Sequence, residues 1–445
     1  MQARHRGGLR LLPLACVIFL VVSGGAYGIE DAVGAAGGRL VLLLCIIVPL
    51  TVSLPTALMA AELTALLPME GGFYLWVKEA LGPFAGFIEA YLTLLYTAVD
   101  TAIYPVLFSA YLAAFIPLSF ASRLAVGLAL IWLSGGLNLL GIRPVGRASS
   151  WLTVLLLAPL AALVIVGMPR LAHFRLPAPT QHPGGFLAPL GGALIIVIWN
   201  FCGWENPSVV AGEIEEPQRN YLRAVLLALP VVVLGCLLPL MVSLSGQADT
   251  SAWRAGYFAR VGYSLGGPTL GIALGLGGAL FAFAVFQAEM MWTARLPFVL
   301  AQDGYLPRGL ARMWERTATP ARAIALCCVV FTLASPLGFR DLVMLDVFFY
   351  MGALALEMAA LIRLRRRFPH RGGLFTVGGG RPGLYAVALA PVLTWMATFG
   401  LDLSRPVIDQ FYAALMLSGL ALPVYGLCRY CFGGPSRASE AQRDR

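Results

Sequence analysis

The feature that most constrains this chain is the repetition of long apolar segments along its whole length. Each is long enough for a helix to cross a bilayer, and short polar stretches separate them. Twelve such segments lie near residues 11–36, 39–67, 81–116, 123–140, 149–168, 187–212, 222–244, 268–300, 321–338, 342–363, 384–402 and 407–430. Only 12% of the 445 residues are charged, whereas soluble domains carry about 25%. The sequence therefore predicts an all-α polytopic membrane protein with 12 transmembrane helices.

The basic residues predict how these helices are oriented. If the N-terminus is cytoplasmic and the spans alternate, most of the 31 lysines and arginines fall on the inner side, as the positive-inside rule requires. We therefore expect cytoplasmic tails at 1–10 and 431–445 in a multi-pass protein of the cell inner membrane. The net charge of +9 belongs to these inner loops and does not indicate a nucleic-acid partner. A signal peptide is the alternative for the first segment, but the rest of the chain is equally apolar.

The cysteines and histidines do not form a pattern typical of a metal site. The eight cysteines lie in or beside apolar segments, where a free cysteine packs as a small apolar side chain. The four histidines lie in predicted tails or loops, and Cys428 and Cys431 have no accompanying second pair. We expect neither a metal ion nor another cofactor.

The first and sixth segments are interrupted by glycine and polar residues. Residues 22–34 include several glycines, Ser23 and the adjacent carboxylates Glu30 and Asp31, and residues 199–208 include Asn200 and Glu205. Irregular backbone at membrane depth is tolerated only where it is buried in protein or lines a cavity. We therefore predict that helices 1 and 6 are unwound in the middle of the membrane.

The two interruptions also predict the domain organisation. They lie about 175 residues apart, and each opens a set of five spans, 11–168 and 187–363. An odd number of spans inserts the second set upside down relative to the first, and paired interruptions in such repeats indicate a transporter site at the midplane. Two extra helices at 384–430 follow and are expected to be peripheral.

Nearly all ionisable residues inside the predicted spans are carboxylates. The only lysine, Lys78, lies in a predicted inner loop. Buried carboxylates must bind a cation, take up a proton or face water, so acids without bases predict a cationic substrate, a coupling proton, or both. The nine acids are Glu30, Asp31, Glu62, Glu89, Asp100, Glu205, Glu289, Asp346 and Glu357.

These acids are not all expected to have the same role. Glu30, Asp100 and Glu205 lie near broken or central backbone, where we expect a function. For Glu62, Glu89, Asp346 and Glu357 we favour a simpler interpretation: each lies at the end of a helix, where its side chain reaches water. Glu289 is expected to pair with Arg295 at the inner end of its segment.

The unwound backbone and its aromatic neighbours suit an amino acid or an amine. The N-termini of half-helices attract a carboxylate, and freed carbonyl groups attract ammonium. Additional carboxylates suit a second ammonium, as in a diamine or a basic amino acid. The aromatic side chains that could add cation–π contacts are Tyr27, Tyr96, Tyr104, Trp199 and Trp204.

At these residues the chain resembles the amino acid–polyamine–organocation superfamily of secondary transporters, in particular its polyamine-uptake and L-type amino acid transporter-like branch. The resemblance covers about residues 15–360. Its motifs are Ser23-Gly24-Gly25 through Glu30-Asp31, Ala61-Glu62-Leu63, Pro68 with Gly71-Gly72, Asp100 followed by Tyr104-Pro105-Val106-Leu107-Phe108, Ala211-Gly212-Glu213, Ala288-Glu289-Met290 and Gly304 with Leu306-Pro307.

The resemblance implies a LeuT-type fold of five plus five inverted helices with two more, alternating access, and usually proton coupling. Helix 5 has no lysine, and Glu205 is followed by Asn206-Pro207 where the plant branch has an aspartate and no proline. The implied substrate-binding residues are Ser23, Gly24, Gly25, Ala26, Tyr27, Gly28, Asp100, Tyr104, Asn200, Phe201, Cys202, Gly203, Trp204 and Glu205, with Tyr350 as a further candidate. The residues implied in proton coupling or gating are Glu30, Asp31 and Glu289.

Together these features predict a secondary transporter that imports a cationic amine or amino acid with protons, with polyamines favoured over plain amino acids. The alternatives are a neutral amino acid exchanger of the same fold, a channel, a nutrient sensor that does not transport, and a membrane enzyme. An enzyme acting on lipid phosphates would need clustered aspartates with a metal, or basic residues at depth. The acids here are spread over several helices, so an enzyme is not expected.

Overall fold

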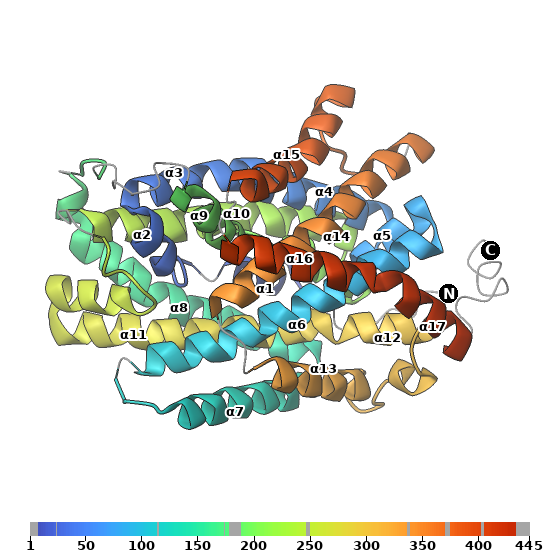
Figure 1. The fold of residues 1–445 in the computed structure, drawn as a ribbon, viewed down its shortest axis with the longest axis horizontal. Coiled ribbons are helices and arrows are strands. Elements are labelled where there is room, and N and C mark those ends of the chain that lie inside the picture. Colours follow the sequence, from blue (N-terminus) through green and yellow to red (C-terminus); the bar gives the residue numbers. More distant parts are fainter. Residues whose placement is uncertain are drawn as a thin grey trace.

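The computed structural model describes residues 8–23, 25–113, 115–172, 174–177, 188–245, 250–335, 339–369, 374–401 and 405–432. Within these ranges the regular elements are helices, accompanied by two isolated bridges, Leu9 with Ile214 and Trp314 with Thr319. The helices run lengthwise in one bundle (Figure 1).

The helices up to residue 171 are α1 (Leu11–Val22), α2 (Glu30–Ala36), α3 (Gly38–Val48), the π-helix η1 (Pro49–Ser53), α4 (Leu54–Leu66), α5 (Gly72–Leu81), α6 (Pro83–Ala113), α7 (Phe120–Asn138) and α8 (Ile142–Leu171). The later ones are α9 (Ala188–Trp199), the 3₁₀ helix η2 (Asn206–Glu213), α10 (Pro217–Leu244), α11 (Tyr257–Thr293), α12 (Arg295–Gln302), the 3₁₀ helix η3 (Arg308–Ala311), α13 (Ala321–Ala334), α14 (Phe339–Arg367), α15 (Gly380–Leu401), α16 (Arg405–Gly419) and α17 (Ala421–Phe432).

Nine helical stretches among the described residues are long and apolar enough to cross a membrane, which agrees with a polytopic membrane protein. The helices α1, α9 and α13 are apolar but shorter. Two of these, α1 and α9, end where the sequence predicted interruptions, at Val22 and Trp199.

Local sequence explains the irregular turns inside two long segments. Pro49 begins η1, and Pro55 follows it in α4; both lack the N–H that an α-helical hydrogen bond needs. In α11 the backbone breaks at Gly266 and Gly267, just before Pro268. Gly267 has φ +69°, a conformation that glycine adopts without the steric cost of a Cβ atom.

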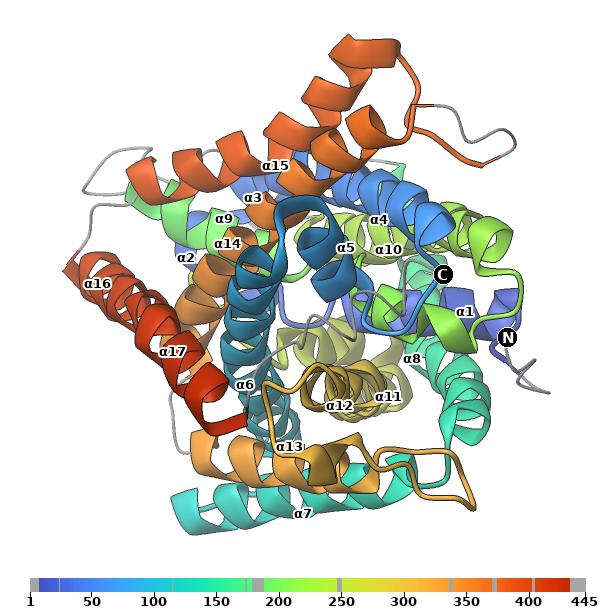
Figure 2. The ribbon, with the colours of Figure 1, turned by 90° about the vertical axis from the view of Figure 1, so that its right-hand side faces the viewer.

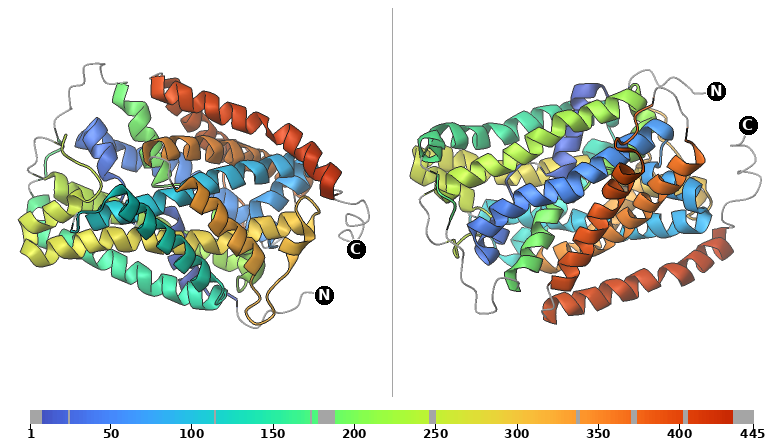
Figure 3. Two further views of the ribbon diagram at one scale, coloured as in Figure 1. Left: turned by 60° about the horizontal axis from the view of Figure 1, so that its bottom comes forward. Right: turned by 90° about the horizontal axis from the view of Figure 1, so that it is seen from above.

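The core of the bundle is formed by α6, α11 and α14 (Figure 2). Helix α6 packs against both α11 and α14, and α11 also packs against α8 and α1. About 67% of the apolar window of each of the spans of α6, α11 and α14 is buried, against 22% for α15 and 17% for the span of α16 and α17. Figure 3 shows α16 and α17 along the outside of the bundle. The peripheral position expected for the last two segments is thus observed.

The end of the bundle that carries α5 and α12, on the right in Figure 1, is tied together by ion pairs. Lys78 Nζ on α5 lies 2.6 Å from Asp303 Oδ2, just after α12. Arg295 Nε on α12 lies 3.1 Å from Glu213 Oε1 at the end of η2. The expected pairing of Arg295 with Glu289 is therefore wrong, because Glu213 from a different element occupies the guanidinium.

Glu62 was expected to reach water at a helix end, and this is wrong too. Glu62 is only 6% exposed. Its carboxylate accepts a 2.6 Å hydrogen bond from Val377 N and lies 3.2 Å from Arg365 Nε. Chain segments far apart in sequence cover it.

Candidate functional site

The first break separates α1 from α2 by seven residues that are not helical where the structure describes them. Gly24 lies outside the described residues. Gly25 and Gly28 have φ of +102° and +90°, which reverses the chain at a point where larger residues would be strained. Ser23 is buried, and its hydroxyl donates to Gly25 O at 2.9 Å.

Glu30 is the first residue of the second half-helix and is fully buried. Its carboxylate accepts hydrogen bonds from Gly28 N at 2.9 Å, from Tyr111 OH at 3.0 Å and from Gly256 N at 3.2 Å. A carboxylate at a helix N-terminus is stabilised by the free N–H groups and by the helix dipole. Glu30 therefore joins the break in α1 and α2 to α6 and to the start of α11.

The second break follows α9 and is fixed by side chains from other helices. Ser53 Oγ, at the end of η1, donates to Phe201 O at 2.7 Å. Tyr221 OH on α10 donates to Trp204 O at 2.7 Å, and Trp204 Nε1 donates to Phe201 O at 3.0 Å. Phe201 and Trp204 are completely buried, so their rings pack in the core around the break.

Asp100 links the two breaks to the middle of α6. Its carboxylate accepts from Trp199 Nε1 at 2.8 Å and from Tyr104 OH at 3.1 Å. The Tyr104 ring stacks on the Trp199 indole with centroids 6.1 Å apart. A Cβ atom at Gly28 would lie 2.9 Å from Trp199 Cζ3. The structure thus brings predicted residues from three separate segments into contact.

A small cavity of about 10 Å³, room for about one water molecule, lies beside this cluster. Its polar lining comes from both breaks and from α6, through Ser23, Asn200 and Tyr104. Phe281 and Val285 of α11 complete the apolar wall. These two residues were not among the expected site residues, because nothing in the glycine-rich sequence of α11 indicates which face is turned to the breaks.

Glu205 and Cys202 lie on the other side of the second break. Glu205 Oε2 accepts from Tyr350 OH at 3.1 Å, and the same hydroxyl accepts from Gly203 N at 3.1 Å. Tyr350 therefore connects α14 to the break. Cys202 is partly buried, and its thiol donates to Trp199 O at 3.3 Å.

Ala26 and Tyr27, also expected in the site, are buried away from this cavity's lining. Tyr27 packs among Tyr111, Phe258 and Phe281, with ring centroids 5.9 to 6.1 Å apart. Its hydroxyl has no hydrogen-bond partner among the described residues. Tyr27 therefore lies nearer to Glu30 and Tyr111 than to Asp100.

Three acids expected at water-exposed helix ends lie in the interior instead. Glu89 is 0% exposed, and Asp346 and Glu357 are each 2% exposed. The expectation failed because both α6 and α14, which carry these acids, lie in the middle of the bundle rather than at its surface. Glu289 is also buried, within electrostatic reach of Asp100 and Asp346.

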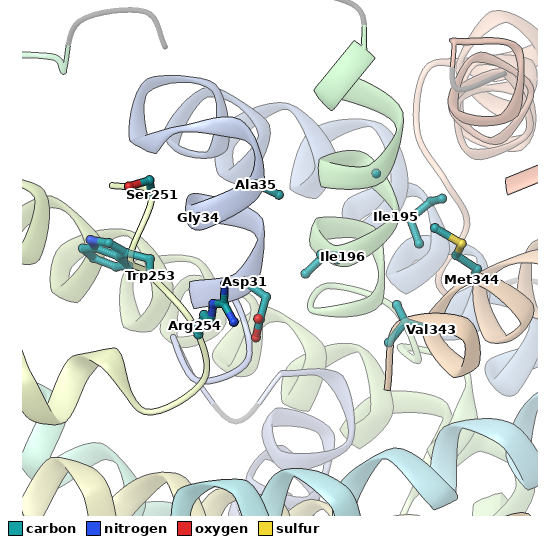
Figure 4. Close-up of a pocket in the computed structure, with 11 residues that line it drawn as sticks. Asp31, Gly34, Ala35, Ile195, Ile196, Ser251, Trp253, Arg254, Val343 and Met344 are labelled. Atoms are coloured by element: carbon teal, nitrogen blue, oxygen red, sulfur yellow. The ribbon is translucent and has the colours of Figure 1, made fainter. Parts of the chain in front are cut away.

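A larger open pocket of about 320 Å³ lies at the end of the bundle away from α5. Asp31 and Arg254 line one side, and Ile195, Ile196 and Met344 line the opposite side (Figure 4). Asp31 Oδ2 accepts from Ala255 N at 3.2 Å. Asp31 therefore faces a solvent-accessible pocket, whereas its neighbour Glu30 points into the protein.

Replacing Gly28 with alanine is expected to destabilise the protein by about 1–3 kcal/mol, because the backbone has φ +90° and the new methyl group would press on Trp199. Thermal unfolding in detergent would measure the change. Gly136→Ala is the matched control, because no atom lies within 4 Å of the added methyl group. Equal unfolding midpoints for the two variants would contradict the tight approach at Gly28.

Comparison with known proteins identifies the family. The sequence profile described as amino acid permease matches residues 9–417. The chain is 32% identical to the polyamine transporter RMV1 of Arabidopsis thaliana over 86% of this chain and 79% of that protein. It is 31% identical to the polyamine transporter PUT1 of Oryza sativa subsp. japonica, over 93% and 77%. It is 25% identical to the human large neutral amino acids transporter small subunit 2, over 91% and 76%. The resemblance noted from the sequence motifs is confirmed, and the chain belongs to the amino acid permease family.

Proposed function

We propose that this permease imports cationic amines, and polyamines in particular, together with protons across the cell inner membrane. The observation that carries the proposal is the set of buried carboxylates around the two helix breaks. Asp100, Glu205 and Glu289 are at most 7% exposed. None of the ion pairs among the described residues involves any of these three acids. A cationic substrate or protons must therefore neutralise them.

Under this proposal Asp100 receives one ammonium group of the substrate. Trp199 and Tyr104 orient its carboxylate, and their stacked rings add an aromatic wall. The backbone and side chains of the two breaks form the remaining contacts. We assign to substrate binding Ser23, Gly24, Gly25, Ala26, Tyr27, Gly28, Asp100, Tyr104, Asn200, Phe201, Cys202, Gly203, Trp204 and Glu205.

Glu30, Asp31 and Glu289 are assigned to proton coupling or gating. Glu30 already accepts from Gly28 N, two residues before α2 begins. Free N–H groups of a broken helix are the ones that would attract the carboxylate of an amino acid. Its occupation by Glu30 favours an amine without a carboxylate. The names of two relatives, both polyamine transporters, point in the same direction.

The architecture that goes with this function has 12 transmembrane helices with both termini in the cytoplasm. Helices 1 and 6 are unwound in the membrane, and the two inverted repeats span 11–168 and 187–363. Residues 384–430 add two helices outside the repeats. The end that carries Lys78, Arg295 and Arg365 would face the cytoplasm, in keeping with the positive-inside rule.

A neutral amino acid exchanger is the second candidate, favoured by the similarity to the human large neutral amino acids transporter subunit. Uptake into proteoliposomes separates the two. With acidic medium outside, we expect uptake of putrescine, spermidine or arginine that collapses when a protonophore removes the gradient. Uptake of leucine alone would refute the proposal. Accelerated counterflow of one amine by another would distinguish a carrier from a channel or a silent sensor.

A further inference from the structure

The helices α6 and α14 carry carboxylates at matching positions along a shared seam. They pack against each other in the middle of the bundle (Figure 2). Glu79, just before α6, pairs with Arg367 at the end of α14, and Tyr96 meets Tyr350 between them, a register that sets Asp100 opposite Asp346 and Glu89 opposite Glu357. Eleven residues separate the acids on each helix, which is about three α-helical turns, so each pair lies on one face of its helix. The helices therefore run in opposite directions. Their acids form two pairs, or rungs, about 16 Å apart along the bundle: Asp100 with Asp346, and Glu89 with Glu357.

Aromatic rings lie between the two rungs at the same register. Tyr96 is one turn from Asp100, and Tyr350 is one turn from Asp346. The two rings meet edge to face with centroids 5.5 Å apart. They lie between the rungs, and the faces of such rings attract cations.

The rung away from Asp100 consists of Glu89 and Glu357, with Glu205 of the second break close to both. The three residues are 0%, 2% and 1% exposed, in that order. Glu89 Oε1 accepts from Thr93 Oγ1 at 2.7 Å, and Glu205 Oε2 accepts from Tyr350 OH at 3.1 Å. Within the described chain, the groups acting on these three carboxylates include no lysine, arginine or histidine.

Two oxygen atoms in this rung are left without a partner. Glu89 Oε2 and Glu357 Oε2 are buried and have no hydrogen-bond partner among the described residues. Buried charged oxygens without partners are costly, so such atoms in a stable protein indicate a missing ligand or bound protons. Both residues belong to the packed helices α6 and α14, and a donor between these helices would satisfy them.

We infer that Glu89, Glu205 and Glu357 form a second ammonium site, three helical turns from Asp100, which selects long linear polyamines. This inference rests on the proposed function. An extended chain advances about 1.2 Å per bond, so the terminal nitrogens of a four-carbon diamine are separated by about 6 Å, and those of linear tri- and tetraamines by about 11 and 16 Å. Of these, only the tetraamine can place its terminal ammonium groups on both rungs, which are about 16 Å apart.

The experiment measures inhibition of labelled spermidine uptake by putrescine, spermidine and spermine in proteoliposomes. For the wild type we expect the inhibition constant to fall at least tenfold from putrescine to spermine. In Glu89→Gln/Glu357→Gln, a nearly isosteric change, the putrescine-to-spermine ratio should fall at least tenfold. Glu79→Gln is the control, because Glu79 is exposed and pairs with Arg367 Nη1 at 2.8 Å on the same end of the protein. It should keep the wild-type ratio.

Each other outcome overturns the inference. An unchanged ratio in the double variant, with or without a loss of overall uptake, would mean that these acids serve a step common to all amines. If the double variant does not fold, the same ratio is measured for the two single glutamine variants. An unchanged ratio in both would overturn the inference. Wild-type protein that transports amines without a length preference refutes the second site alone. Wild-type protein that transports no cationic amine refutes the proposed function as well.

Discussion

Replacing Asp100 with asparagine is expected to abolish uptake of cationic amines while the protein still folds and inserts. Asparagine has nearly the same shape, and its amide oxygen can still accept from Trp199 Nε1 and Tyr104 OH. It has no charge to offer an ammonium group. Losing one partner of a buried, hydrogen-bonded charge pair costs about 2–5 kcal/mol, so the KM for amines should rise at least tenfold.

Uptake of labelled spermidine by wild-type and variant proteoliposomes, matched for inserted protein, would measure this effect. Asp409→Asn is the control, because Asp409 is an exposed aspartate on the peripheral helix α16. It should transport like the wild type. Unchanged uptake by Asp100→Asn would remove Asp100 from the site, whatever the family resemblance implies.

Replacing Glu213 with glutamine is expected to destabilise the protein by about 3–5 kcal/mol. The Arg295 side chain is 2% exposed, so removing its partner leaves a buried charge without compensation. The ion pair between Arg10 and Glu215 offers a contrast, because these side chains are 81% and 43% exposed. Glu215→Gln should change stability by less than about 0.5 kcal/mol.

Thermal unfolding in detergent of the single variants and of Glu213→Gln/Arg295→Met would test the pair. Removing both charges avoids an unpaired ion, so the double variant should unfold at a higher temperature than Glu213→Gln alone. A double variant less stable than either single one would show that the two side chains act independently.

The sequence predicted where the helices of this fold end better than it predicted which residues they contact. The ends of α1 and α9 fall at the expected interruptions because glycine, proline and polar residues act locally on the backbone. The hydrogen bond from Trp199 Nε1 to Asp100 was not predicted, because it depends on how α9 packs against α6. Contacts decided by tertiary packing were missed. Arg295 lies six residues from Glu289 in sequence, yet Glu213 reaches it from η2.

The same limit explains the four carboxylates that were expected to reach water. Each was expected to lie at the end of a helix, where its side chain could reach water. Whether a carboxylate meets water depends on which helices surround it, and hydropathy along one segment carries no information on that. Glu62 is covered by residues more than 300 positions later in the chain. Phe281, which closes the cavity beside Asp100, was missed for the same reason.

The short helix α5 has a mechanical consequence. Its first turn is held by η2, because Gly71 N donates to Val209 O at 2.9 Å. Its last turn is held by the end of α12 through the largely buried pair of Lys78 and Asp303. A helix fixed at both ends cannot lengthen, so η2 cannot shift relative to the end of α12 unless α5 tilts or releases one of these contacts. Helix α5 therefore couples the second break mechanically to the end of α12.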